Sequence, residues 1–420
     1  MSGILPEELP LPALKDTPTI TGMPDPNPAA VSSIELSNTR TAFAHRSNPE
    51  LLKMELLFSL MNHPGLNRIA IQTLMWAIRW KLPVKFLVKS TIFGQFCGGE
   101  SIEECLETSA RLARFGVGTI LDYSVEGEKN EAGFEKVKEE TLRTIRTASG
   151  RKEIPFAVFK TTGIADAGLM EKVEQGKDLS ASEQTQLEAA RLRFAEICRF
   201  AAQKEVRIFV DAEESWIQGL IDQWTYEEMA IHNRITPIVY NTYQLYRRGV
   251  LAAFQDAAAR AKAEGYFIGA KLVRGAYMEK EAAYAEAAGL PNPIQPGKAA
   301  SDLDFNSAVA FCLENLETIH FCAGSHNEES NRLLAMRMQE VGLEKNDERI
   351  WFAQLLGMSD NISFTLAAMG FNVAKYVPYG PVFSVMPYLI RRAAENTSVA
   401  GQTSRELNMI RAERKRRREG

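Results

Sequence analysis

The 420-residue sequence has only five cysteines, and none of them forms a Cys-x-x-Cys pair. An odd, scattered set of cysteines argues against a disulfide-stabilised fold and against a thiolate zinc site. The five histidines show no His-x-x-x-His spacing, so we predict no metal site. No apolar run approaches the roughly 18 residues that span a bilayer, and the first residues resemble neither a signal nor a transit peptide. We therefore expect a cytoplasmic protein that is at most peripheral at the inner face of a membrane.

Acidic residues outnumber basic ones, but the excess is not spread evenly. Of the 49 basic and 53 acidic residues, six and two lie in the last ten positions, which leaves an excess of eight acidic residues elsewhere. An acidic body argues against nucleic-acid binding. The basic tail, residues 406–420, is typical of a solvated helix end, and it also suits an anionic lipid surface.

The first part of the chain differs from the rest in composition. Seven prolines within the first 28 residues disfavour helices and sheets, so we predict an extended arm over residues 1–48. Residues 49–114 carry apolar side chains at helical spacing and are predicted to be helical. Within them, Trp76 and Trp80 lie among basic residues, a composition that suits a membrane interface. We expect these tryptophans to pack against the rest of the protein.

Residues 115–405 alternate between short β-rich runs and longer helical segments. The eight runs are 118–125, 155–161, 207–212, 237–242, 267–273, 319–323, 350–354 and 373–377. Eight strands with intervening helices predict an α/β fold of the (β/α)8 barrel type, preceded by the helical extension. A doubly wound sheet would normally carry a fingerprint of three glycines after its first strand. Here Gly116 and Gly118 precede or enter the strand, and the third glycine is missing. We therefore predict no nicotinamide dinucleotide site.

Polar residues follow or end seven of these runs, where barrel enzymes place their reactive groups. They are Lys160, Asp211, Asn241, Arg274, His326, Gln354 and Tyr376. Lys160 suits either a Schiff base or a pairing with a substrate carboxylate. Arg391 and Arg392 offer two forked cations to a carboxylate, which points to an amino acid or a keto acid.

Several local strings resemble the proline dehydrogenase family. They are Phe159-Lys160, Val210-Asp211-Ala212-Glu213, Lys271-Leu272-Val273-Arg274-Gly275-Ala276-Tyr277, Ala353 to Met358, Lys375 to Gly380, and Tyr388 to Asn396. The resemblance runs in order from about residue 95 to 405 and is nearest to the single-function members. It implies a distorted (β/α)8 barrel that holds FAD, oxidises L-proline to 1-pyrroline-5-carboxylate and passes electrons to a membrane quinone.

The resemblance also implies roles for individual residues. It points to Lys160, Tyr376, Arg391 and Arg392 as substrate contacts, and to Asp211 as a catalytic acid group. For the flavin it points to Ala212, Asn241, Lys271, Val273, Arg274, Gly275, Ala276, Ser325, His326, Gln354 and Glu395. Glu100 matches a gate residue that pairs with the first arginine of the pair.

Chemical reasoning adds two kinds of role to these. Lys160 and Arg274 are expected to act as catalytic cations, Arg274 or Lys271 by favouring the anionic reduced flavin. Leu356 and Tyr388 are expected to form apolar walls. The sequence departs from the family where Asn241, Lys271 and Met278 replace the more usual glutamine, arginine and tryptophan.

Two other interpretations stay open at this point. One is a Schiff-base lyase or aldolase barrel that uses Lys160. The other is a non-catalytic membrane-associated protein, built on the basic tail and on the helices that carry Trp76 and Trp80.

Overall fold

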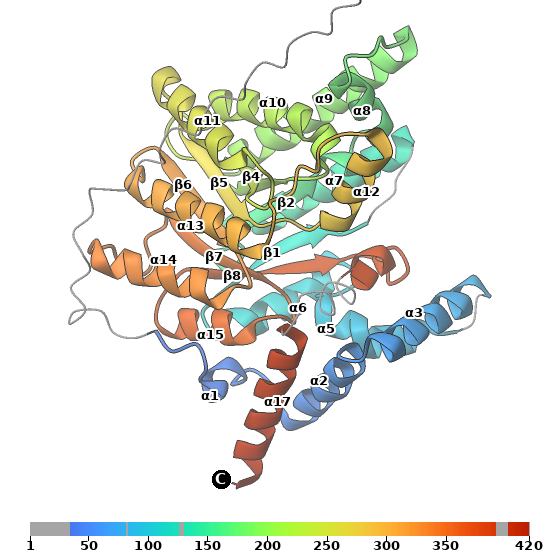
Figure 1. Cartoon of the computed structure of the whole chain (residues 1–420), viewed down its shortest axis with the longest axis vertical. Helices are drawn as coiled ribbons and strands as arrows, with labels where there is room; N and C mark the ends of the chain where they lie inside the picture. The colour runs from blue at the N-terminus through green and yellow to red at the C-terminus, as the bar shows by residue number, and fades with distance from the viewer. Residues whose placement is uncertain (1–33, 81–82, 126–129, 392–401, 420) are drawn as a thin grey trace, which may run out of the picture. The chain divides into compact units, whose positions relative to one another are not determined.

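Eight parallel strands close into a barrel in the order in which they occur along the chain (Figure 1). This computed structural model describes residues 34–80, 83–125, 130–391 and 402–419. The strands are β1 (Val117–Tyr123), β2 (Phe156–Lys160), β3 (Arg207–Asp211), β4 (Val239–Gln244), β5 (Ile268–Val273), β6 (Ile319–Gly324), β7 (Ile350–Leu355) and β8 (Val373–Tyr379). The predicted barrel is confirmed, and every strand boundary lies within two residues of its expected place.

Helices surround the barrel, one directly before β1 and the others between successive strands (Figure 1). They are α6 (Ile102–Ala113), α7 (Glu131–Ala148), α8 (Ala167–Glu174), α9 (Ala181–Gln203), α10 (Ser215–His232), α11 (Val250–Glu264), α12 (Met278–Ala288), α13 (Lys298–Glu314), α14 (Glu328–Glu340) and α15 (Asp360–Ala368). Local sequence explains where several of them begin. The Ser180 hydroxyl accepts from the backbone N–H of Glu183, whose carboxylate accepts from the Ser180 N–H in return, so this capping box fixes the start of α9.

Side chains alternate between the inside and the outside of the barrel, as strand geometry requires. Inside, aromatic rings of neighbouring strands stack, with Phe156 and Phe209 4.3 Å apart and Tyr240 edge-on to both. Gly269 on β5 leaves the space that the Tyr240 ring fills, because a Cβ at this position would overlap the ring. The interior is therefore a packed core, and only its ends are open to chemistry.

The segment before the barrel is helical, as predicted from residue 49 onward. It contains α2 (Asn48–Met61), α3 (Pro64–Arg79), α4 (Lys85–Val88), a π-helical turn at Lys89–Phe93 (η1) and α5 (Gly94–Phe96). The predicted extended arm is wrong in its described part, because residues 39–42 form helix α1 (Thr39–Ala42) and Ile34 and Leu36 are buried. Residues 1–33 lie outside the described residues.

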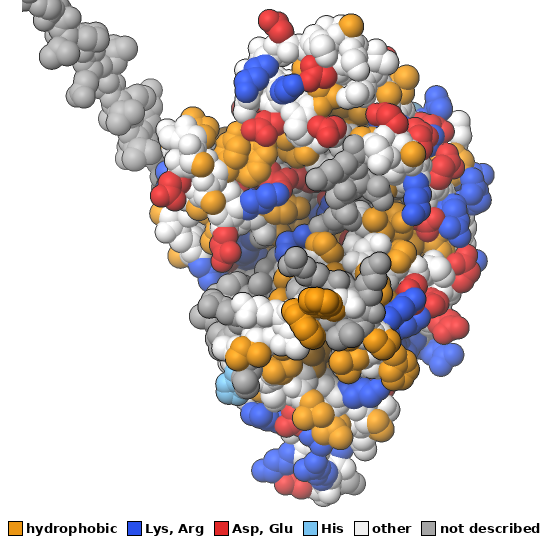
Figure 2. Space-filling view, turned by 90° about the vertical axis from the view of Figure 1, so that its right-hand side faces the viewer, with side chains coloured by type: hydrophobic (Ala, Val, Ile, Leu, Met, Phe, Trp, Pro, Cys, Tyr) orange, Lys and Arg blue, Asp and Glu red, His pale blue; other side chains and the backbone are white. Residues whose placement is uncertain are grey.

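The tryptophans of α3 and its end do not pack as expected. The ring centroids of Trp76 and Trp80 lie 6.1 Å apart, but the two side chains remain 56% and 65% exposed. Phe86 and Leu87 on α4 are also exposed. Figure 2 shows hydrophobic side chains gathered in the lower half of the face toward which α3 projects in Figure 1. Among the described residues, no helix has the length and apolar character needed to cross a membrane.

The C-terminal helix α17 (Gln402–Glu419) packs against α2 and α1. Its contacts involve the residues that make the tail basic. Glu413 is fully buried and accepts from Arg416 and Arg417, while Glu55 of α2 accepts from Arg411 and Arg414. Four of the six cations among the last ten residues are therefore paired within the protein, although they share only two carboxylates.

Candidate active site

Strand register brings the inward-facing polar residues of β2, β3, β5 and β8 together. Lys160 and Asp211 are partners across β2 and β3. Asp211 lies two positions beyond Phe209 and so points into the barrel, as do Lys271, two beyond Gly269, and Tyr376, two beyond Ala374. The carboxyl ends of the strands thus converge on a single charged cluster, Lys160, Asp211, Lys271 and Tyr376, hereafter the mouth cluster.

Asp211 is the centre of the mouth cluster. Its Oδ2 accepts from Lys160 Nζ at 3.1 Å, and its Oδ1 pairs with Lys271 Nζ. Burial acts to raise the pKa of Asp211, but the two ammonium groups outweigh burial and hold this pKa below its ordinary value. Asp211 is therefore ionised at neutral pH, between the amines of Lys160 and Lys271. A second carboxylate, that of Asp122, lies 3.8 Å from the Lys160 amine.

Tyr376 forms the floor of the mouth cluster. Lys271 Nζ donates to its hydroxyl at 2.7 Å, and the ring lies parallel to Phe209 at 6.2 Å. Burial, reinforced by the Asp211 carboxylate, raises the pKa of Tyr376 well above its usual value, so the phenol stays neutral. The residue does not end its strand as expected, since β8 continues to Tyr379.

Glu213, in the loop after β3, connects the turn after β2 to the end of β4, and the sequence predicted no role for it. Its carboxylate accepts from the Thr162 N–H at 2.9 Å and from the Thr162 hydroxyl, and its carbonyl accepts from Gln244 Nε2 at 3.0 Å. Burial raises the pKa of Glu213 to about 7. Partial burial, and after it the charge of Glu213, raises the pKa of the half-buried Tyr277, a phenol that lies within electrostatic range of Lys160 and Arg391 as well. A second acidic residue directly after Asp211-Ala212 was the available signal.

A second polar cluster lies after β5 and β6. Arg274 Nη1 donates to Ser325 Oγ at 2.7 Å and Nη2 to Ser330 Oγ at 2.8 Å, while Nε pairs with Asp302 at 2.6 Å. Gly275 follows with φ near +144°, and a Cβ there would overlap the Tyr246 ring, so only glycine fits without displacement. Val273, the last residue of β5, and the exposed Ala276 lie beside this turn.

His326 stands directly after Ser325 at the end of β6. Its Nδ1 lies 2.9 Å from Ser359 Oγ, which belongs to the loop after β7. The predicted flavin contacts Lys271, Arg274, Ser325 and His326 therefore all lie at the carboxyl ends of neighbouring strands.

Two predicted flavin contacts point away from the mouth. Asn241 does not end β4, and its Nδ2 donates outward to Asp222 of α10 at 2.8 Å. The inward-facing residue at the end of β4 is Gln244, the glutamine that the sequence analysis missed because it ended this strand at Thr242. Gln354 likewise points outward, where it donates to the Ser325 carbonyl and accepts from Ser363 of α15.

The predicted apolar walls are also displaced. Leu356 belongs to the core between the barrel and its helices, whereas Leu355, the register partner of Tyr376, packs against the interior aromatic cluster. Tyr388 is buried in a separate core with residues of α2 and α17. The strand parity of β7 thus favours Leu355 over Leu356 as the wall next to Tyr376.

The remaining predicted contacts lie around the entrance. Glu100 is paired with Lys85 at 2.9 Å and with Lys89 at 3.0 Å, and although burial acts to raise its pKa, these lysines lower it. Arg391 is helical and half-buried, and Ala212 directly follows β3. Arg392 and Glu395 lie outside the described residues.

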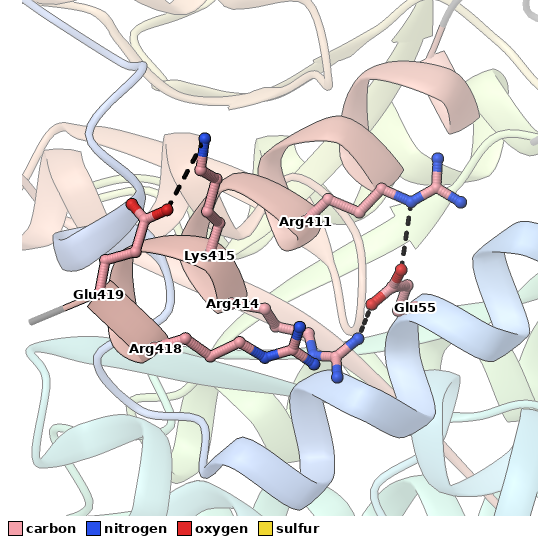
Figure 3. Close-up of a pocket in the computed structure, with 6 residues that line it drawn as sticks. All are labelled: Glu55, Arg411, Arg414, Lys415, Arg418 and Glu419. Carbon is pink, nitrogen blue, oxygen red and sulfur yellow. Dashed lines mark hydrogen bonds and ion pairs between the residues drawn. The ribbon is translucent and has the colours of Figure 1, made fainter.

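A basic pocket of about 390 Å³ lies between α2 and α17. Figure 3 shows its lining of Glu55, Arg411, Arg414, Lys415, Arg418 and Glu419, with Glu55 directed at the first two arginines. Lys415 pairs with Glu419 at 3.8 Å. The pocket is formed by the tail and is distinct from the mouth cluster.

Fold and site together define an α/β barrel with a cluster of charged residues at the carboxyl ends of its strands. Comparisons with known proteins specify the class: the proline dehydrogenase family model matches residues 105–405. The chain therefore belongs to the proline dehydrogenase family, a family of oxidoreductases.

Two relatives and one solved structure illustrate this membership. Proline dehydrogenase 1, mitochondrial, of Arabidopsis thaliana is 32% identical over 374 residues, covering 79% of this chain and 75% of the relative. Hydroxyproline dehydrogenase of Xenopus laevis is 29% identical over 412 residues, covering 89% and 88%. Proline utilization A of Bdellovibrio bacteriovorus superimposes with a TM-score of 0.67 at 20% identity. The superposition covers 86% of this chain and 38% of that longer protein. This last likeness supports the fold.

Proposed function

We propose that this chain binds FAD at the carboxyl ends of its barrel strands and oxidises L-proline to 1-pyrroline-5-carboxylate. The observation that carries the proposal is the mouth cluster, in which one carboxylate is held between two lysines within a family of proline dehydrogenases. When bound, FAD supplies a hydride acceptor for the carbon beside the substrate nitrogen.

The residues at the mouth fit such a cofactor. Arg274, Ser325 and His326 offer a guanidinium, a hydroxyl and an imidazole on adjacent strand ends, a set of groups that suits a pyrophosphate and sugar hydroxyls. Gly275 exposes bare backbone next to them. We assign Gln244, rather than Asn241, to the cofactor side of β4, because Gln244 shares the inward face with Tyr240.

The chain's own residues would orient the substrate. Lys160 and Arg391 are cations that can hold a carboxylate, and Arg392 is predicted to join them. Asp211 fixes Lys160 and at the same time limits the positive charge of the mouth. Tyr376 presents a neutral ring, and the walls around it keep water from the reacting carbon.

A Schiff-base mechanism fits this geometry less well. Lys160 lies 3.1 Å from Asp211 and 3.8 Å from Asp122, and two carboxylates favour the charged form of an amine. A Schiff-base lysine must be neutral to attack a carbonyl carbon.

We further propose that the electrons pass to a membrane quinone and that the chain attaches to an anionic membrane surface. The exposed Trp76, Trp80, Phe86 and Leu87 support an attachment through α3 and α4, where amphipathic rings suit the interface. The basic tail contributes less than its composition suggests, because five of its six cations are paired with Glu55, Glu413 or Glu419, and these three carboxylates halve its positive charge.

A visible absorption spectrum of the purified protein tests the proposed function. We expect a flavin spectrum that bleaches when L-proline is added under anaerobic conditions. A protein that neither carries FAD nor takes it up would contradict the cofactor assignment. A flavin that bleaches only with trans-4-hydroxy-L-proline would contradict the proline assignment. It would indicate hydroxyproline as the substrate, as in the name of the Xenopus laevis relative.

A further inference from the structure

Helix α17 begins as the family match ends. The match stops at residue 405, and α17 runs from Gln402 to Glu419. Figure 1 shows its first turn beside the barrel and its last turn at the C-terminus. Glu406, the first residue beyond the match, is 7% exposed. A buried carboxylate at the start of a surface helix requires polar partners, so its contacts indicate what the helix does there.

Glu406 is connected to His326 through a single residue. Its Oε1 accepts from the backbone N–H of Ser359 at 2.5 Å, and the Ser359 hydroxyl lies 2.9 Å from His326 Nδ1. Three elements of the chain, α17, the loop after β7 and the loop after β6, are thus joined by two consecutive hydrogen bonds.

The backbone of Ser359 is held in an unusual conformation. Its φ and ψ are 50° and 44°, in the left-handed region that residues other than glycine rarely adopt. Ser359 also precedes α15 at the N-cap position, yet its side chain makes no capping hydrogen bond. Its hydroxyl is directed to His326 instead. Such strain persists only where the surroundings fix it, and Glu406 is the acceptor that holds the N–H of this residue.

The neighbouring residue of α17 reinforces the same two loops. Arg405 pairs with Glu328, which stands two residues after His326, and the other Glu328 oxygen accepts from Asn361 Nδ2 at 2.7 Å. Asn361 lies two residues after Ser359. Two consecutive residues of α17 therefore contact the segments after β6 and β7: Arg405 binds Glu328, and Glu406 binds Ser359.

We propose that Glu406 is a positioning residue for the cofactor site: through Ser359 it fixes the imidazole of His326 toward the FAD. The inference rests on the proposed function, since it takes His326 to contact FAD. It makes α17, a segment almost wholly beyond the family match, a working part of this chain's cofactor site.

FAD affinity of the full-length protein, freed of cofactor, provides the test. Quenching of FAD fluorescence would be measured for wild type, Glu406→Ala, Glu406→Gln and Ser359→Ala, with thermal unfolding to check folding. We expect Glu406→Ala to raise the Kd for FAD about tenfold, because Ser359 and His326 are then no longer held in place before FAD binds. Glu406→Gln keeps an acceptor oxygen and should raise it about threefold or less. Glu55→Gln loosens α17 from α2 away from these loops, and should change it less than about twofold.

A double-mutant cycle tests whether Glu406 acts through Ser359. In a Ser359→Ala background, Glu406→Ala should add less than about a twofold change in Kd. Independent, multiplying effects, or an unchanged Kd in Glu406→Ala, would overturn the inference while the wild type still binds FAD. Failure of the wild type to bind FAD would instead overturn the proposed function.

A readout that needs no cofactor completes the design. With 15N-labelled histidine, the ring signals of His326 should change in Glu406→Ala and remain in place in Glu55→Gln. His326 signals that are identical in wild type and Glu406→Ala would overturn the link.

Discussion

The inner and outer faces of the same strands carry similar polar residues and use them differently. On β4, Gln244 faces the mouth and donates to the carbonyl of Glu213, a loop residue next to the mouth cluster, whereas Asn241 faces the helices and is held by Asp222 of α10. On β8, Tyr376 joins the mouth cluster, whereas the adjacent Lys375 is fully buried outside and pairs with Asp360 at 2.9 Å. The difference teaches that position at a strand end is not enough. Strand parity decides whether a polar residue serves the site or the scaffold.

The largest effect should come from the centre of the inner face. Asp211→Ala leaves Lys160 and Lys271 close together without their shared carboxylate, and an uncompensated buried charge costs about 3 to 5 kcal/mol. We expect kcat/KM for L-proline to fall at least about a hundredfold in steady-state assays with an artificial electron acceptor. Flavin content serves as the control for folding. A variant within threefold of wild type would remove Asp211 from the site.

Glu213 sharpens the comparison through pH. Its pKa is 4.5 in a model peptide and about 7 in the folded protein, so the folded state retains a proton that the unfolded state has released. The stability of the wild type should therefore decrease as pH rises from about 4.5 to 7 and then level off. Glu213→Gln lacks this titration. Its unfolding free energy relative to wild type should increase across that window by as much as about 3 kcal/mol.

Chemical denaturation at pH 5 and at pH 8 measures this difference. A difference that is independent of pH would show that Glu213 is ionised throughout this range. Its pKa would then not be raised by burial, contrary to the prediction.

The arginine pair tests the substrate side of the inner face. Arg391→Met or Arg392→Met should raise the KM for L-proline about tenfold to a hundredfold, because each loses a charge-assisted bond worth about 1.5 to 3 kcal/mol. Flavin content should stay at the wild-type level. A normal KM for proline together with normal inhibition by tetrahydro-2-furoic acid would exclude that arginine as a carboxylate contact.

Tyr376 should produce the smallest of these effects. A bulky ring at this position leaves little room for a 4-hydroxyl group, so we expect L-proline to be preferred over trans-4-hydroxy-L-proline about tenfold or more in kcat/KM. Tyr376→Ser should narrow this ratio, chiefly by weakening proline binding through the cavity that it leaves. Equal use of both substrates by the wild type would show that Tyr376 does not control ring size.

The sequence was sufficient for the barrel because its signals are local and repeated. Each strand is a short β-branched or aromatic run, and each helix has its own periodicity, so eight independent segments agree. Lys160, Asp211, Lys271 and Tyr376 were predicted as site residues and do lie together. Their spacing in sequence carries no geometry, but the family strings placed them on strands whose inner faces converge when the barrel closes.

What the sequence could not supply depends on single-residue shifts and on distant contacts. Ending β4 at Thr242 rather than Gln244 concealed the inward-facing glutamine, and the choice between Leu355 and Leu356 depends on one position of parity. The contact between Glu406 and Ser359 joins residues 47 positions apart, and no local pattern predicts it. The exposure of Trp76 and Trp80 likewise depends on which surfaces the rest of the chain leaves uncovered.

The two amides of β4 provide the most direct test of the parity argument. We would measure the rate constant for anaerobic flavin reduction at saturating L-proline in Gln244→Ala and in Asn241→Ala, together with the unfolding free energy of each. The inward Gln244→Ala should lower the rate constant about tenfold or more. The outward Asn241→Ala should keep the rate constant within about twofold and lose about 1 kcal/mol of stability, because the half-buried Asp222 loses one of its two donors and keeps only Gln218. The reverse pattern, a slowed reaction in Asn241→Ala and a normal one in Gln244→Ala, would contradict the assignment of the inner face as the active site.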